Sequence, residues 1–503
     1  MSALFDEYYT SIRKDLEDLG ERDLLRAAGI GAFFRAMDRS DGEITGAIQE
    51  AFGISSEAFW EAARRLHNLE VLDMYEDKVV RTSDQVLATY LFYLAFFKEQ
   101  ALDFSALLDR FFPRLRHRLV DAINPVLNAF DSEAIVEAMR PHVDSIWKSM
   151  EEAVDEEDLL HLMDVFWFLK QTDTLPYVQR RIEEMEPKPV DLSDMDFKAS
   201  SNIPSPSLLS LLSAFRDADA NTFRMTLALL LSYLMKWPEE LPQVLHLLTK
   251  RFGFRHTSYL RGFSVQRAVI EVLWERAQDG KDELFSKLFL AVAEQYSHAR
   301  FYTTESKGAR AITMIDFQLP PISELFELRR TIWKRLLQLY QAPAFRGAVL
   351  GVLHKYSASR YEVSLSEVIA YDAEMLLPFV ESELHPGSLR HCLIVQEYLD
   401  PLEDHKVSFN KELHNQFRSE TFLISELLTL DWPEKQTLGM GYGEYQRYKK
   451  DRVKEYFAHY AYADYERFFE QCLGVQTKSD TPRKAGGLMS RAASKAVTRV
   501  CHL

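Results

Sequence analysis

The stretch that decides the N-terminal fold is SEAFWEAARRLHNLEVLDMYEDKVVRT, residues 56–82. In its first half, apolar residues recur at helical spacing after Ser55 and Ser56, and either serine can cap a helix. Its second half holds two short apolar runs around the acidic dipeptide Glu76-Asp77, which predicts a β-hairpin. Two more helices are predicted before it, over 22–37 and 43–51. Three helices followed by a hairpin are the order of a winged helix, a helix-turn-helix with a β wing.

Downstream of Asp84, the chain is predicted to be almost entirely α-helical. Only 19 Gly and 18 Pro interrupt 503 residues, and apolar residues recur at i, i+3, i+4 and i+7. Alternating polar and β-branched runs are nearly absent. The predicted helices follow one another in pairs without an exact repeat period, which favours an irregular α-solenoid of paired antiparallel helices. The expected fold is therefore mostly all-α, an N-terminal winged helix followed by this solenoid.

The changes of pattern along the chain divide it into five segments. Residues 1–84 are expected to form an N-terminal helix and the winged-helix domain, and 85–186 a first helical array. Residues 187–206 hold four of the 18 prolines and are expected to form an irregular loop. Residues 207–475 form a second helical array, predicted as helical runs over 207–356 and 364–473. Residues 476–503 carry six Lys or Arg against one Asp, which predicts a basic disordered tail.

Charge and cysteine content narrow the class of protein. Lys and Arg total 60 against 76 Asp and Glu, a net charge of -16 that repels phosphate. This argues against a nucleic-acid scaffold but leaves a local basic patch open. The three cysteines, Cys392, Cys472 and Cys501, form no CxxC pair, so neither a zinc site nor a disulfide framework is indicated. The acidic N-terminus is no signal peptide, and no apolar run could span a membrane. We expect a cytoplasmic protein without membrane contact.

Catalytic signatures are missing from the sequence. No GxxxxGK[ST], HExxH, GxSxG or EF-hand motif occurs. The glycine-rich stretch at 439–443 lacks a βαβ context and is interpreted as a loop between helices. The SxxK match at 145–148 has no partner motif and is interpreted as chance. No catalytic, cofactor-binding or metal-binding residue is therefore named, and a non-enzymatic protein is expected. An enzyme built from dispersed carboxylates and histidines is an alternative that no pattern selects.

The winged helix raises the question of DNA binding. In winged-helix DNA readers the third helix enters the major groove and the wing touches the backbone. The candidate DNA contacts are Arg64, Arg65 and His67 on the third helix, and Lys78 and Arg81 on the hairpin. These five cationic residues are matched by six carboxylates on the same elements and the link between them, at Glu57, Glu61, Glu70, Asp73, Glu76 and Asp77. A structural or protein-contact module is therefore predicted, with a DNA-binding transcriptional regulator that has a helical ligand domain as the alternative.

Four stretches resemble a known family. LHNLEVLDMYEDKVVRTSDQVLATYLFY (66–93) resembles the end of the winged helix, and the helix leaving it, in large bacterial STAND proteins (signal-transduction ATPases with numerous domains) of antiphage defence. Their helical sensor array is similar to FWFLKQTDTLPYVQRRI (166–182), SYLRGFSVQRAVIEVLWE (258–275) and ITMIDFQLPPISELFELRRTIWKRLLQLY (312–340). The similarity covers residues 24–473.

This resemblance implies a sensor function. In that family an ATPase module precedes the winged helix, the helical array recognises a foreign protein, and the ATPase drives oligomerisation. This chain has neither the P-loop nor the Walker-B acid, so no family catalytic residue is carried over. It is expected to be a split subunit, a truncated product or a remnant. The resemblance implies a helical scaffold or sensor that binds a protein, either a separately encoded ATPase or a phage protein.

Overall fold

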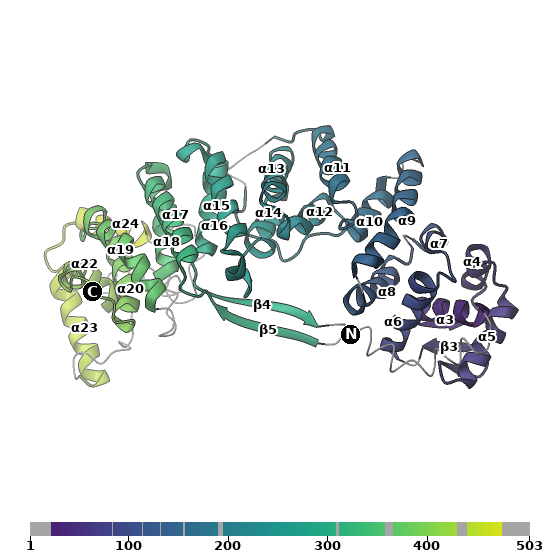
Figure 1. Cartoon of the computed structure of the whole chain (residues 1–503). Coiled ribbons are helices and arrows are strands. Elements are labelled where there is room, and N and C mark those ends of the chain that lie inside the picture. The colour runs from purple at the N-terminus through teal and green to yellow at the C-terminus, as the bar shows by residue number, and fades with distance from the viewer. Residues whose placement is uncertain are drawn as a thin grey trace. The chain divides into compact units, whose positions relative to one another are not determined.

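The computed structural model of the protein describes residues 22–82, 84–112, 114–130, 132–153, 156–189, 195–307, 311–357, 366–429 and 440–474. The prediction of a mostly α-helical protein is confirmed (Figure 1). The helix expected before residue 22 and the tail expected over 476–503 lie outside the described residues. The chain divides into two compact units, the first comprising residues 1–184 and 204–214 and the second 185–203 and 215–503. The described residues of the Pro-rich segment 187–206 form neither helix nor strand.

The described part of the first unit opens with three helices and a three-stranded antiparallel sheet, here called the N-terminal module. Asp41 and Ser55 accept backbone N–H bonds at the start of the second and third helices. The predicted hairpin is present, and Glu76 and Asp77 both have the positive φ that a type I′ turn requires. The third strand lies between the other two. The elements are α3 (Arg22–Phe34), β1 (Ala36–Asp38), α4 (Gly42–Phe52), α5 (Ser56–Asn68), β2 (Leu72–Tyr75) and β3 (Val79–Thr82).

Strand β1 corrects the helix predicted over 22–37. The helix ends at Phe34 because Arg35 has a φ of 62°, in the left-handed region that a helix cannot continue through. Ala36, Met37 and Asp38 then pair with β3. Met37 is buried in the strand as it would have been in a longer helix. The apolar spacing alone therefore does not reveal where the helix ends.

The rest of the first unit is a set of packed helices. α3 packs against α5 and α6, α6 against α8, and α7 against α9. α9 also contacts α8 and α10, and α12 contacts α10 and α11. The helices are α6 (Gln85–Tyr93), which continues as the π-helical turn η1 (Leu94–Lys98), α7 (Phe104–Phe111), α8 (Arg116–Ala129), α9 (Ser132–Ala153), α10 (Glu156–Phe166), α11 (Gln171–Glu184) and α12 (Leu208–Ala214).

Gly29 allows α3 to approach η1 closely, and this gives a first prediction. A Cβ atom at Gly29 would lie 2.3 Å from the Cβ of Ala95 and 3.0 Å from Cδ1 of Leu102. We expect Gly29→Ala to destabilise the first unit by about 2 kcal/mol, because overpacking a helix contact outweighs the gain in helix propensity. The same change at Gly46, on the exposed face of α4 with nothing within 4 Å, is expected to stabilise it by about 0.5–1 kcal/mol.

Hydrogen exchange of the α3 and α6 amides, followed by mass spectrometry, measures both effects. If Gly29→Ala and Gly46→Ala change the protection of these amides from exchange in the same direction, the result contradicts the close contact at Gly29.

The second unit arranges its helices in two rows. One row runs α13, α15, α17 and α19, and the other runs α14, α16, α18 and α20, with each helix contacting the next in its row (Figure 1). Successive helices also pack across the rows, and α22 and α24 contact α20. The helices are α13 (Ala220–Lys236), α14 (Leu241–His246), α15 (Ser264–Ala277), α16 (Glu283–Tyr296), α17 (Ser323–Tyr340), α18 (Pro343–Ser357), α19 (Ser366–Glu383), α20 (Leu389–Asp404), α21 (Glu412–Gln416), α22 (Glu420–Thr429), α23 (Tyr442–Phe457) and α24 (Tyr462–Gly474).

Short 3-10 and π-helical turns join several of these helices. They are η2 (Phe215–Asp217), η3 (Pro238–Glu240), η4 (Leu247–Arg251), η5 (Ser258–Arg261) and η6 (Gln278–Gly280).

A β-hairpin interrupts the second helical array and corrects the helical run predicted over 207–356. Strands β4 (Arg300–Lys307) and β5 (Ala311–Gln318) pair antiparallel along their whole length. Both are rich in β-branched residues, which favour an extended backbone. These residues are Thr303, Thr304, Ile312, Thr313 and Ile315.

Candidate functional site

The residues predicted to contact DNA lie in the N-terminal module, where several already bind protein groups. Arg64 on α5 places its Nε 3.4 Å from Oδ1 of Asp77 in the hairpin turn. Lys78 places its Nζ 3.4 Å from Oε2 of Glu76. The acidic turn thus offsets the charge of both cations, one on α5 and one on the β2–β3 hairpin.

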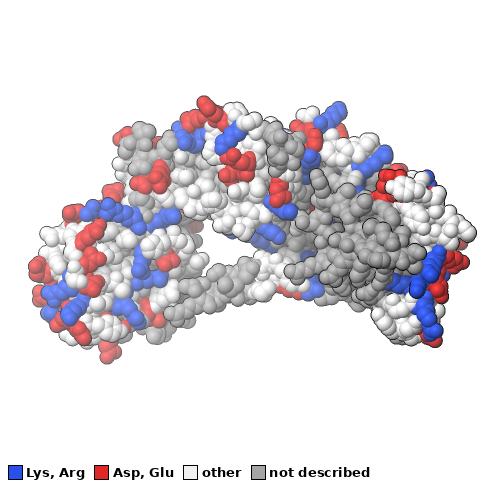
Figure 2. All heavy atoms as spheres, turned by 180° about the vertical axis from the view of Figure 1, so that it is seen from behind, with Lys and Arg blue, Asp and Glu red and all other residues white. Residues whose placement is uncertain are grey.

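The other three candidates do not complete a basic surface. The Nδ1 atom of His67 lies 3.0 Å from the carbonyl oxygen of Leu72 and 3.3 Å from the backbone nitrogen of Met74, so its ring ties α5 to β2. Arg65 is half-buried, and Arg81 is exposed but lies opposite Asp73 in the β2–β3 ladder. On the face drawn in Figure 2, the cations and carboxylates of the described residues are interspersed. The candidate cations therefore do not form a continuous basic surface among the described residues.

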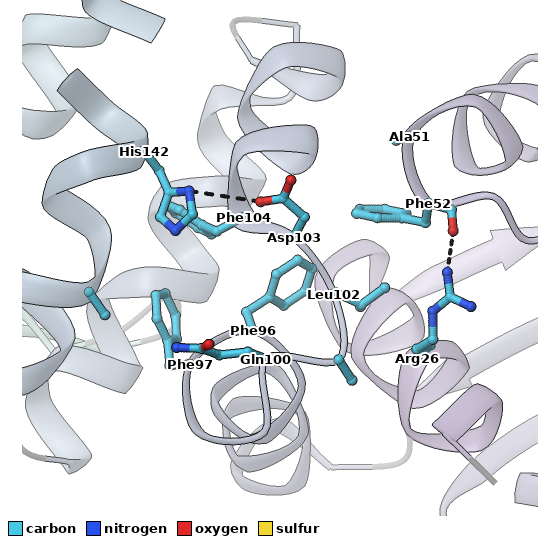
Figure 3. Close-up of a pocket in the computed structure, with 12 residues that line it drawn as sticks. Arg26, Ala51, Phe52, Phe96, Phe97, Gln100, Leu102, Asp103, Phe104 and His142 are labelled. Atoms are coloured by element: carbon cyan, nitrogen blue, oxygen red, sulfur yellow. Dashed lines mark hydrogen bonds and ion pairs between the residues drawn. The ribbon is translucent and has the colours of Figure 1, made fainter. Parts of the chain in front are cut away.

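A pocket of about 420 Å³ opens in the first unit between α3, the end of α4, η1, α7 and α9 (Figure 3). That volume lies within the roughly 300–1,000 Å³ of small-molecule sites. The wall is aromatic, formed by Phe52, Phe96, Phe97 and Phe104. The polar groups belong to Arg26, Gln100, Asp103 and His142.

The polar groups of this pocket are arranged for structure rather than for nucleophilic catalysis. The Oγ of Ser105 lies 2.5 Å from Nδ1 of His142, and Oδ1 of Asp103 lies 3.8 Å from the same nitrogen. A Ser-His-Asp nucleophile needs its serine and aspartate on opposite ring nitrogens. Asp103 instead accepts the backbone N–H of Ser105 at 2.9 Å and caps α7. The Arg26 guanidinium donates to the carbonyl of Phe52 and to Asp23, which fixes α3 to the end of α4.

In the second unit, a buried ion pair joins four helices. The side chains of Arg329 on α17 and Asp372 on α19 are 1% and 0% exposed. The Nε of Arg329 lies 2.9 and 3.0 Å from the two carboxylate oxygens. The hydroxyl of Tyr356 on α18 donates to the same carboxylate at 2.7 Å, and Nη2 of Arg329 donates to the carbonyl of Ser297 at the end of α16. Burial lowers the pKa of Arg329, but the charge and hydrogen bonds of Asp372 raise it above its ordinary value.

This ion pair also anchors the root of the β4–β5 hairpin. Arg329 donates to the carbonyl oxygens of Ser297 and His298, just before β4, at 2.7 and 3.4 Å. The backbone N–H of Leu319 donates to the carbonyl of Ala299 at 3.0 Å and closes the root. The ring of Phe301 packs 4.9 Å from that of Phe254, between centroids. The hairpin is therefore attached to the helices through buried groups.

The two strands extend away from α16 and α17 and are here called the arm, residues 300–307 and 311–318 (Figure 1). Tyr302 is 65% exposed and Met314 is 76% exposed. Tyr302 pairs with Asp316, two residues from Met314, so both apolar side chains lie on one face of the arm. Two-stranded hairpins are marginally stable alone in water, and their edges offer unpaired backbone groups to another chain. The arm is the candidate functional site.

Comparisons with known proteins assign no family to the chain. No protein-family model, no curated protein and no solved structure matches it. The resemblance to STAND proteins therefore stays a prediction. In the part of the chain that the structure describes, no helix has the length and apolar character to cross a membrane. Across those same residues, His, Cys, Asp and Glu side chains nowhere gather in threes as a metal ion would need.

The arm was not predicted, although the sequence holds a signal for it. The stretches RFYTTESK and AITMIDFQ are rich in β-branched and aromatic residues and flank Gly308. Such runs around a glycine indicate a hairpin. The surrounding helical pattern outweighed this signal. The first-unit pocket and the Arg329–Asp372 pair have no comparable local signal, because their residues come from distant parts of the chain.

Proposed function

We propose that the protein is a non-enzymatic helical scaffold that binds another protein, and that the arm forms part of the contact. The observation that carries this proposal is the contrast between the buried root of the arm and the exposed side chains just beyond it. Its root is held by the buried Arg329–Asp372 pair, whereas Tyr302 and Met314 are exposed further out. A fixed root lowers the entropy lost on binding. Aromatic and methionine side chains are enriched in protein interfaces.

The arrangement of the helices supports the same function. The order α3, β1, α4, α5, β2, β3 with a β1-β3-β2 sheet fits a winged helix, which we propose serves as a protein-contact module. The two helix rows of the second unit fit an irregular α-solenoid, an architecture that presents extended binding surfaces. We propose a sensor-like function similar to that of the STAND helical array. The partner would be a separately encoded ATPase or a phage protein.

The DNA-binding regulator is the alternative with less support. Its candidate cations Arg64 and Lys78 lie beside Asp77 and Glu76, and the chain carries a net charge of -16. A phosphate backbone would meet these carboxylates as well as the cations.

Photo-crosslinking tests the proposed contact. A photoreactive amino acid placed at Tyr302 or Met314 is expected to capture the same discrete protein in host cells. At Tyr462, which is 83% exposed on α24 and outside the arm, it is expected not to capture that protein. The partner identified in this way is then titrated against purified chain. Tyr302→Ser with Met314→Ser is expected to weaken binding by about tenfold or more, because apolar anchors dominate interface energies.

The matched control is Tyr462→Ser, which is expected to leave the affinity unchanged. Identical crosslinking patterns at Tyr302, Met314 and Tyr462 would contradict an arm-mediated contact. So would full affinity in the doubly substituted arm.

A further inference from the structure

Three arginines converge on one aspartate in the second unit, around a pocket of about 190 Å³. Oδ1 of Asp217 lies 3.0 Å from Nη1 of Arg216 and 3.1 Å from Nη1 of Arg261. Its Oδ2 lies 3.6 Å from Nη1 of Arg255. Three guanidinium charges minus one carboxylate leave a surplus of two positive charges among the residues that line the pocket. The pocket is therefore suited to an anion.

Two buried polar atoms of pocket residues lack a hydrogen-bond partner within the described chain. Arg216 is 7% exposed, and its Nη1 and Nη2 donate to Asp217 and to the carbonyl of Gly253, while its Nε is unpaired. Gln266 is 1% exposed, and its Nε2 donates to the carbonyls of Phe252 and Gly253 at 2.9 and 2.8 Å, while its Oε1 is unpaired. Because both side chains bind the carbonyl of Gly253, the unpaired donor and the unpaired acceptor belong to neighbouring groups. A ligand that both accepts and donates hydrogen bonds would satisfy them.

The lowered pKa of Arg216 also favours an anion in the pocket. Burial lowers the pKa of its guanidinium, and the like charges of Arg255 and Arg261 lower it further. The folded chain therefore holds this cation at a free-energy cost, which an anion in the pocket would offset. Glu324 lies nearby, with its side chain packed against Gly262. Its carboxylate accepts a hydrogen bond from the hydroxyl of Ser323.

The first turn of α15 forms another side of the pocket. Gly262 and Phe263 both have left-handed backbone angles, with φ of 56° and 54°, and α15 begins directly after them. No side chain caps the start of this helix. Ser264, Val265 and Gln266 of its first turn line the pocket. The first N–H groups of a helix have no acceptor within the helix, and they favour an anion.

The size and the polar groups of the pocket select the ligand. A volume of about 190 Å³ lies below the roughly 300 Å³ at which drug-sized sites begin, so one small group fits. The surplus of two charges suits a dianion. Oε1 of Gln266 and the Asp217 carboxylate are acceptors, so they favour an anion that carries a proton. We propose that this pocket binds inorganic hydrogen phosphate, which combines two negative charges with one O–H donor, and discriminates against sulfate.

Isothermal titration of the full chain with sodium phosphate and sodium sulfate, at neutral pH and constant ionic strength, tests the proposal. Phosphate is expected to bind, and sulfate is expected to bind at least about tenfold more weakly, because it has no proton to donate to the unpaired Oε1 of Gln266. Arg255→Ala and Arg261→Ala replace exposed side chains, so they are expected to fold normally. Each is expected to weaken phosphate binding by about tenfold or more, because each removes charge-assisted hydrogen bonds.

Two further variants distinguish a specific phosphate site from a positively charged surface that attracts any anion. Arg267→Ala, on α15 but paired with Glu327 and outside the pocket lining, is expected to leave phosphate affinity unchanged. Asp217→Asn is expected to narrow the ratio between phosphate and sulfate affinity, because it removes a charged acceptor and adds net positive charge. The proposal is overturned if phosphate does not bind, if sulfate binds equally well, or if Arg261→Ala and Arg267→Ala have the same effect.

Discussion

Replacing Asp372 with asparagine is expected to lower the free energy of unfolding of the helices packed around it, α16 to α19, by about 3–5 kcal/mol. The substitution keeps the shape of the side chain but leaves the Arg329 guanidinium buried without its counter-ion. The hydroxyl of Tyr356 also loses a charged acceptor. Urea denaturation followed by Trp333 fluorescence measures the effect, because Trp333 is buried on α17 with its ring 5.0 Å from that of Tyr356.

Two further variants test whether burial of the ion pair is the cause of the expected loss of stability. Arg224→Ala removes an ion pair with Glu271 on the surface and is expected to cost about 1 kcal/mol or less. The double substitution Arg329→Met with Asp372→Leu is expected to recover most of the loss, because no charge is then left buried. A loss for Asp372→Asn no larger than that for Arg224→Ala would contradict this account.

Acidification from about pH 6.5 to about pH 4 is expected to destabilise the second unit through His298. Burial lowers the pKa of this histidine to about 4, and the charges of Arg329, Lys355 and Lys250 add to the effect. The unfolded chain takes up a proton near pH 6.5, whereas the folded chain resists it. The stability that neutral His298 provides is therefore complete above that pH and is lost as the pH falls. The expected loss is roughly 2–3 kcal/mol.

Urea midpoints measured across this pH range test the assignment. His298→Gln removes the titrating group and is expected to flatten this part of the stability profile. His256→Gln replaces an exposed histidine of the same unit and is expected to keep the wild-type slope. If the urea midpoint changes equally with pH in His298→Gln and in the wild type, other groups cause the acid sensitivity.

Elements set by local signals could be predicted from the sequence. Helix α4 covers Gly42–Phe52, within one residue at each end of the helix predicted over 43–51. The Ser55 cap and the turn at Glu76-Asp77 depend on neighbouring residues alone. The end of α3 could not be predicted, because it depends on pairing between β1 and a strand more than forty residues later. The arm has only a weak local signal within a strongly helical region.

The candidate sites depend still more on distant residues. Arg329 and Asp372 are 43 positions apart, and Asp217 and Arg261 are 44 apart. In sequence each is an ordinary charged residue, and only the folded chain shows that the first pair is buried or that the second borders a pocket. The sequence places the DNA candidates on the third predicted helix and on the hairpin, but only the structure gives the distance that pairs Arg64 with Asp77.

The two helix rows also determine how the second unit is expected to lose its structure. Each helix contacts mainly its neighbours. The stability of each helix therefore depends on adjacent helices rather than on the whole unit. Helices α22 to α24 have a hydrophobic cluster of their own, formed by Ile424, Leu428, Val453, Phe457 and Phe468. This end of the rows can melt while the Arg329–Asp372 region stays folded. Heating should therefore give a broad transition in several steps, and one melting temperature would not describe the molecule.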